Sequence, residues 1–156
     1  MCGIAIIFLQ ESAGPILTFT PAAADTLLAL FRDTQTGPED YDAIVTGDLG
    51  QVGHDLLMQL MREQRLPLID ERYHDCGLMI FDRKKQDVHA GGSGCGCSAT
   101  VLNGYFLPKL QRGELGRIIF MATGALMSTT SSQQGETIPG VAHAVVLESP
   151  QGGKSE

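Results

Sequence analysis

Four glycines and two cysteines crowd into the seven residues from Gly91 to Cys97, within the stretch DVHAGGSGCGCSATVLNGYFL. Cysteine thiols can ligate metals, form redox pairs or act as nucleophiles, and His89 is near enough in sequence to serve as a further ligand or as a base. Glycines also allow a turn to approach another group very closely. We therefore weigh four interpretations of this segment: a zinc site, a redox pair, a catalytic nucleophile and a tight turn beside a ligand.

A zinc site is disfavoured by the number and spacing of its possible ligands. Structural zinc sites use four ligands, and paired cysteines are usually separated by two to four residues. Here one residue separates Cys95 from Cys97, and the only other pair, His74 and Cys76, has the same short spacing. We expect no metal site.

The redox and nucleophile interpretations meet similar obstacles. Redox pairs are normally Cys-x-x-Cys, and a disulfide across the single residue between Cys95 and Cys97 would be strained. Either thiol with His89 supplies a nucleophile and a base, but no GxSxG motif or acid and base pair accompanies them. Two interpretations stay open: tight packing with buried thiols, and a turn whose backbone N–H groups and Ser93 receive a carboxylate.

A second polar segment, TGALMSTTSSQQGE, follows an apolar run that has the character of a buried strand. Ligands of open α/β sheets usually bind just beyond the carboxyl ends of the strands. Simple solvation accounts for most of Ser128 to Ser132, so only Gln133 and Gln134 remain as candidates in this part of the segment.

Composition limits the class of protein. The chain has 156 residues, enough for one domain with its own core, and a formal charge of −7. This charge disfavours a general nucleic-acid or anionic-membrane surface. The longest apolar runs reach about half the length of a bilayer span. We expect a cytosolic protein whose four cysteines are reduced and form no disulfide framework.

Helical and strand patterns alternate along the chain. Thr20 is the expected N-cap of a helix with Pro21 at its first position, closed by Gly37 and Pro38. Further helices are predicted around 52–61 and 99–113, and strands at 43–46, 77–82, 117–124 and 142–148. Pro108 is expected to kink the helix that contains it.

This alternation predicts an α/β fold. The strands should form a mixed sheet covered by helices, with the last two strands as antiparallel neighbours. An apolar segment near the start, GIAIIFL, is a further possible strand.

Several pieces of the chain together resemble the stage V sporulation protein AD family of spore-forming Firmicutes. The resemblance covers about 21–148 and is carried by PAAADTLLALFRDT, YDAIVTGDLGQVG, YHDCGLMIFD, QDVHAGGSGCGCSATVLNGY and FMATGALMSTTSSQQGETIPGVAHAVVLE. It implies the C-terminal half of a thiolase-like fold. We accordingly expect an unplaced segment at 1–20, the half-domain at 21–148 and a disordered tail at 149–156, in a truncated chain.

The resemblance implies a function during sporulation. It implies a binding component for dipicolinic acid (pyridine-2,6-dicarboxylate), with or without calcium, in the uptake machinery of the spore membrane. The expected partners are other stage V sporulation protein A subunits, together with self-association or pairing with a missing N-terminal half. The expected location is cytoplasmic, peripheral to the forespore or spore inner membrane, and no other cofactor is implied.

The resemblance also bears on catalysis. Condensing enzymes carry a histidine at the turn that matches TGDLGQVG, where this chain has Asp48, and thiolases carry a cysteine after the strand where this chain has Thr123. We therefore expect a non-catalytic protein, with a degenerate acyltransferase half or a non-functional fragment as the alternatives. The candidate ligand-binding residues are Asp48, His89, Gly92, Ser93, Gly94, Cys95, Cys97, Thr123, Gln133 and Gln134.

Overall fold

The computed structural model describes residues 7–10, 19–125 and 140–151 of the chain. The strands are β1 (Ile7–Gln10), β2 (Ala43–Thr46), β3 (Tyr73–Asp75), β4 (Arg117–Ala125) and β5 (Gly140–Glu148). The helices are α1 (Phe19–Thr34), the 3-10 turn η1 (Pro38–Asp40), α2 (Gly50–Glu63), α3 (Cys76–Met79), α4 (Cys97–Val101), the π-helical segment η2 (Leu102–Phe106) and α5 (Leu107–Gln111).

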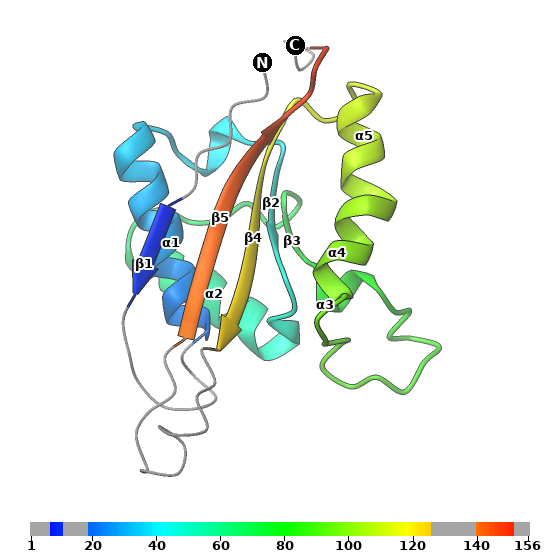
Figure 1. The fold of residues 1–156 in the computed structure, drawn as a ribbon. Coiled ribbons are helices and arrows are strands. Elements are labelled where there is room, and N and C mark those ends of the chain that lie inside the picture. The colour runs from blue at the N-terminus through cyan, green and yellow to red at the C-terminus, as the bar shows by residue number, and fades with distance from the viewer. Residues whose placement is uncertain (1–6, 11–18, 126–139, 152–156) are drawn as a thin grey trace.

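The five described strands form one mixed sheet in the order β1-β5-β4-β2-β3 (Figure 1). β2 pairs in parallel with both β3 and β4, whereas β5 is antiparallel to β4 and to β1. The parallel strands β2, β3 and β4 therefore end at the same edge of the sheet. The expected mixed sheet and the antiparallel pairing of the last two strands are confirmed.

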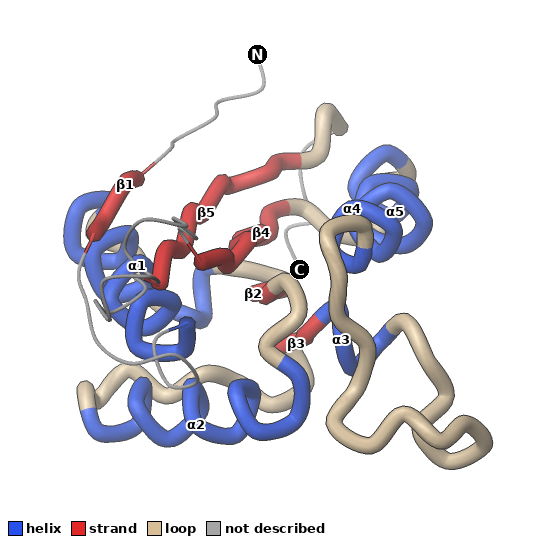
Figure 2. Tube along the Cα trace, turned by 60° about the horizontal axis from the view of Figure 1, so that its bottom comes forward, coloured by secondary structure: helices blue, strands red, loops and turns tan. Residues whose placement is uncertain are grey.

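Helices cover both faces of the sheet (Figure 2). α1 and α2 lie on one face, where Leu27 and Met61 join a buried cluster with Ile119. The continuous helix formed by α4, η2 and α5 lies on the other face, where Phe106 packs with Val45. β2 is buried at all four positions because it lies in the middle of the sheet between these two layers. The α/β fold class predicted from the sequence is confirmed.

The prediction of a strand at 77–82 is wrong. The strand ends earlier, at Asp75, and Cys76–Met79 forms the short helix α3. The Asp75 side chain accepts a hydrogen bond from the backbone N–H of Leu78 at 3.3 Å. This is an N-cap, which favours a helical turn over continued extension of the apolar residues.

The helix that contains Pro108 has an irregular turn just before the proline, and the kink expected there stays a prediction. Proline lacks the N–H that would bond to the carbonyl of Gly104. The segment just before it, Leu102–Phe106, is π-helical, and the Leu107 N–H bonds to the Leu102 carbonyl five residues back. The wider π turn thus accommodates the proline within a helix that continues to Gln111.

Two predicted boundaries differ from the structure. α1 begins at Phe19, so Thr20 lies inside the helix and is buried, and the helix ends at Thr34, three residues before Gly37. Gln35 ends it with a left-handed φ of 55°. Part of the segment predicted to be unplaced, Ile7–Gln10, pairs with β5.

None of the helices in the described ranges is long and apolar enough to cross a membrane.

Candidate functional site

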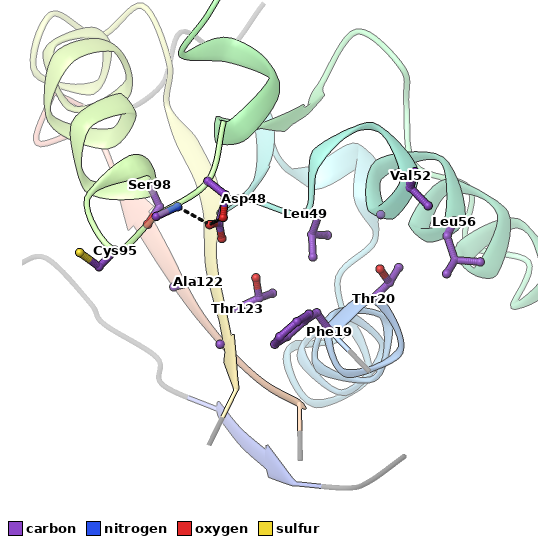
Figure 3. Close-up of a pocket in the computed structure, with 14 residues that line it drawn as sticks. Phe19, Thr20, Asp48, Leu49, Val52, Leu56, Cys95, Ser98, Ala122 and Thr123 are labelled. Carbon is purple, nitrogen blue, oxygen red and sulfur yellow. Dashed lines mark hydrogen bonds between the residues drawn. The ribbon is translucent and has the colours of Figure 1, made fainter. Parts of the chain in front are cut away.

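A cavity of about 560 Å³ lies where the parallel strands β2 and β4 end. The turn after β2, the Gly-rich segment before α4, the end of β4 and the first turns of α1 and α2 surround it (Figure 3). Its lining residues are Phe19, Thr20, Asp48, Leu49, Val52, Gly53, Leu56, Ser93, Gly94, Cys95, Ser98, Ala122, Thr123 and Gly124. The cavity is thus at the sheet edge where ligands of α/β proteins usually bind.

Five of the ten predicted site residues line this cavity. They are Asp48, Ser93, Gly94, Cys95 and Thr123, and they come from three segments that are far apart in the sequence. The structure therefore brings together the Gly-rich segment, the turn after β2 and the end of β4.

Three of the other five predicted residues are described and do not line the cavity, and the remaining two lie outside the described residues. His89 points to solvent, with its side chain 89 % exposed and 3.4 Å from the Asp87 carboxylate. Cys97 is buried in the cluster under α4. Gly92 lies against Ile80 and Phe81. Gln133 and Gln134 fall outside the described residues.

Asp48 organises the polar side of the cavity. Its Oδ2 atom accepts a hydrogen bond of 2.7 Å from the Ser93 hydroxyl and one of 3.0 Å from the Gly94 N–H. Gly94 has a φ of +130°, a backbone conformation that residues with a side chain rarely adopt. The Gly-Ser-Gly turn was predicted to receive a carboxylate, and in the structure the carboxylate that it binds is the protein's own.

Close backbone contacts hold the Gly-rich segment to the neighbouring turns. The Gly92 N–H donates to the Gly77 carbonyl at 2.7 Å, and the Gly77 N–H donates to the Gly47 carbonyl at 3.1 Å. A Cβ atom on Gly77 would overlap the Gly92 carbonyl oxygen, and one on Gly92 would come within 2.6 Å of the Ile80 side chain. Glycine is required at position 77 because the atom in the way belongs to the backbone, whereas a side chain at position 92 would have to displace the side chains of Ile80 and Phe81.

The thiols differ in their surroundings. Burial, together with the nearby Asp75 carboxylate, raises the pKa of Cys76 to about 12. Burial, and then the Asp48 and Asp75 carboxylates, also raise the pKa of Cys97. Cys95 is exposed at the cavity. Among the cysteines that the structure describes, only Cys95 is exposed.

We expect iodoacetamide at pH 8 to alkylate Cys95 rapidly in the folded protein. Cys76 and Cys97 should react at least tenfold more slowly, because the thiolate is the reactive form and both thiols are buried. Peptide mass spectrometry after timed quenching measures each site. In denaturing urea all three should react alike. Equal rates at Cys76 and Cys95 before unfolding would contradict the described packing.

The structure adds lining residues that the sequence did not single out. Phe19, Leu49, Val52 and Leu56 form an apolar side from α1 and α2, and Ser98 extends the polar side from α4. Val52 is 70 % exposed, although it belongs to the apolar pattern that predicted α2. An apolar residue at the solvent-facing edge of the helical pattern, such as Val52, was the feature of the sequence that could have predicted the apolar side of the cavity.

The described residues contain no group of three or more histidine, cysteine, aspartate or glutamate side chains placed to hold a metal ion. In the described lining, Asp48 is the one charged side chain.

The geometry defines an α/β protein with a mixed sheet and a cavity at the carboxyl ends of its parallel strands. The family model of Stage V sporulation protein AD matches residues 11–148. Stage V sporulation protein AD of Bacillus subtilis (strain 168) is 46 % identical over 128 residues, which cover 82 % of this chain and 37 % of that protein. The chain belongs to the Stage V sporulation protein AD family, whose role is in sporulation, and the match spans little more than a third of that relative.

Proposed function

We propose that this chain binds dipicolinic acid without chemical turnover, as a component of the uptake machinery at the spore membrane. The observation that carries the proposal is the cavity in which Asp48, Ser93 and Thr123 face a common space at the sheet edge. Family membership supports a role of the chain in sporulation. The resemblance noted from the sequence supplies the ligand and the thiolase-like scaffold as parts of the same proposal.

The two sides of the cavity suit a flat ring with polar edges. Phe19, Leu49 and Leu56 offer apolar contacts to the faces of a ring, while hydroxyl groups from Ser93 and Ser98 lie on the opposite side. Ligand sites typically combine an apolar lining with a few placed polar groups of this kind. A pyridine dicarboxylate has both features.

The charge of the cavity favours a ligand that carries a cation. No lysine, arginine or histidine is among the described lining residues, and Asp48 adds a negative charge. A bare dicarboxylate would be repelled and would lose its hydration without compensation. Calcium takes carboxylate oxygens as ligands, so a calcium ion bound by dipicolinate can also accept an oxygen from Asp48.

Replacing Asp48 with asparagine should weaken binding of the calcium complex at least tenfold. The amide oxygen can still accept hydrogen bonds from Ser93 and Gly94, but the charge that faces the cation is lost. Affinity for dipicolinate without calcium should stay the same or increase. Isothermal titration with and without calcium measures both affinities.

Asp33→Asn is the matched control, because Asp33 is an exposed carboxylate on α1 outside the cavity. It should leave both affinities unchanged. An equal loss in Asp33→Asn and Asp48→Asn would point to a general charge effect. A rise in the melting temperature of the unaltered chain with millimolar dipicolinate is the first test, since a ligand that binds only the folded state raises it.

The alternative of a degenerate acyltransferase makes a different prediction. Acyl transfer to Cys95 needs a base within hydrogen-bond reach, and His89 is directed to solvent beside Asp87. A cysteine acylated by acyl-coenzyme A, detected by intact mass, would support the enzyme and oppose the binding proposal.

We also propose that the chain acts through partners, on the cytoplasmic side and peripheral to the forespore or spore inner membrane. Its contacts would be with other stage V sporulation protein A subunits and with an N-terminal half of the thiolase-like fold. Light scattering of the chain alone, and after mixing with a separately produced N-terminal half, measures this pairing. A monomer that gains no mass with that half would oppose it.

A further inference from the structure

Asp75, at the end of β3, is a buried carboxylate with only 1 % of its surface exposed. Burial raises its pKa, although its hydrogen bonds act in the opposite direction. Four donors converge on it: the Thr46 hydroxyl at 2.7 Å, and the backbone N–H groups of Leu49 at 3.0 Å, Gly50 at 3.1 Å and Leu78 at 3.3 Å. All four are neutral groups, so these hydrogen bonds compensate for the burial of the carboxylate.

These donors connect Asp75 to the cavity, which it does not itself line. Leu49 and Gly50 directly follow Asp48, and Asp48 in turn holds the Ser93 hydroxyl and the Gly94 N–H. Two donors are on Oδ2 and two are on Oδ1. The carboxylate therefore fixes the backbone of the turn that carries Asp48 from both of its oxygens.

The turn needs such an anchor because its conformation is constrained. Gly50 has a left-handed φ of 66°, and its N–H points inward to Asp75. The next residue, Gln51, donates its N–H to the Ala90 carbonyl of the Gly-rich side at 2.8 Å. A shift of this turn would thus move Asp48 away from Ser93 and Gly94 together.

We infer that Asp75 is a positioning residue of the cavity: it sets ligand affinity by holding the turn at 48–50 in place, without contacting the ligand. The part of this inference that concerns ligand affinity rests on the proposed function. This role explains why position 75 holds a buried carboxylate, which a neutral polar side chain could not replace. Asparagine has one acceptor oxygen, so one end of its side chain would place N–H donors against backbone N–H donors.

Asp75→Asn should therefore weaken binding of dipicolinate with calcium at least tenfold in a protein that remains folded. Leu110→Ala is the matched control, since Leu110 is buried in α5, at the end of the helix away from the cavity. It should lower stability and leave affinity unchanged. Affinities are compared by titration at one temperature. That temperature is chosen from the melting curves so that about 95 % or more of each variant is folded. Equal affinities in the two variants would overturn the inference.

A second measurement is independent of any ligand. Hydrogen exchange of the Gly94 amide, followed by NMR, reports whether Asp48 still holds it. Asp75→Asn should speed this exchange at least tenfold, although Gly94 does not touch Asp75, whereas Leu110→Ala should not speed it beyond the change in global stability. If the unaltered chain binds no dipicolinate, the proposed function fails and exchange alone decides the inference. Unchanged exchange in Asp75→Asn would refute it.

Discussion

Alanine at position 77 should lower the free energy of unfolding by about 3 kcal/mol or more, because overpacking and lost buried hydrogen bonds add together. The new Cβ would overlap the Gly92 carbonyl oxygen and come within 3.3 Å of the Asp48 Cα. These are backbone atoms, which cannot turn away as the end of a flexible side chain does. Urea unfolding followed by circular dichroism measures the loss.

Gly104→Ala is the control for this substitution. Gly104 lies on the exposed side of η2, and apart from its own stretch of helix no atom is within 4 Å of the place that its Cβ would occupy. Alanine there should be neutral or stabilising by up to about 1 kcal/mol, since glycine is a poor helix former. If Gly77→Ala were as stable as Gly104→Ala, the crossing of the segments at Gly77 and Gly92 would not be as close as described.

Truncation of Phe106 to alanine should cost about 3–5 kcal/mol, the range for removing a buried aromatic ring. The ring is 1 % exposed and has its centroid 5.8 Å from that of His74 and 5.0 Å from that of Tyr105. It joins η2 to the face of the sheet. Because α4 leads into this segment, the loss should also loosen the wall of the cavity at Ser98.

Tyr105→Ala tests whether the effect comes from burial. Tyr105 is 43 % exposed, and its hydroxyl accepts a hydrogen bond from Lys109 at 2.9 Å. Its removal should cost less than about 1 kcal/mol, as is usual for substitutions at the surface. Chemical denaturation of both variants gives the comparison, and similar losses would contradict the packing of Phe106 as the main contact between η2 and the sheet.

Periodicity was sufficient to predict the layers of this fold. The strand at 43–46 could be predicted because it is apolar and buried at every position, and the helix after it because its apolar residues recur at helical spacing. Both elements are confirmed. The short helix at Cys76–Met79 was missed because its residues are as apolar as a strand. The aspartate just before it is a recognised N-cap signal, and it was the available evidence in the sequence for a helix start.

The site could be predicted only in part. Ser93 was predicted because it occupies a Gly-rich turn, whereas Asp48 and Thr123 were predicted from the family resemblance, at positions where condensing enzymes and thiolases carry catalytic residues. All three line the cavity at one sheet edge. The apolar wall from Phe19 and Leu56 depends on how α1 packs against α2, a long-range contact that no local pattern encodes. Sequence also gave no reason to prefer Cys95 over Cys97, because their exposure is decided by the direction in which α4 begins.

The outer strand β3 has a consequence for the behaviour of the protein at high concentration. An unpaired strand edge is a template on which another chain can add its own strand, and the hazard grows with the length of the exposed edge. β3 pairs over only three residues, Tyr73 to Asp75, and the chain turns into α3 at once. This edge is too short to recruit a neighbouring molecule, so β3 itself protects the sheet against aggregation on that side.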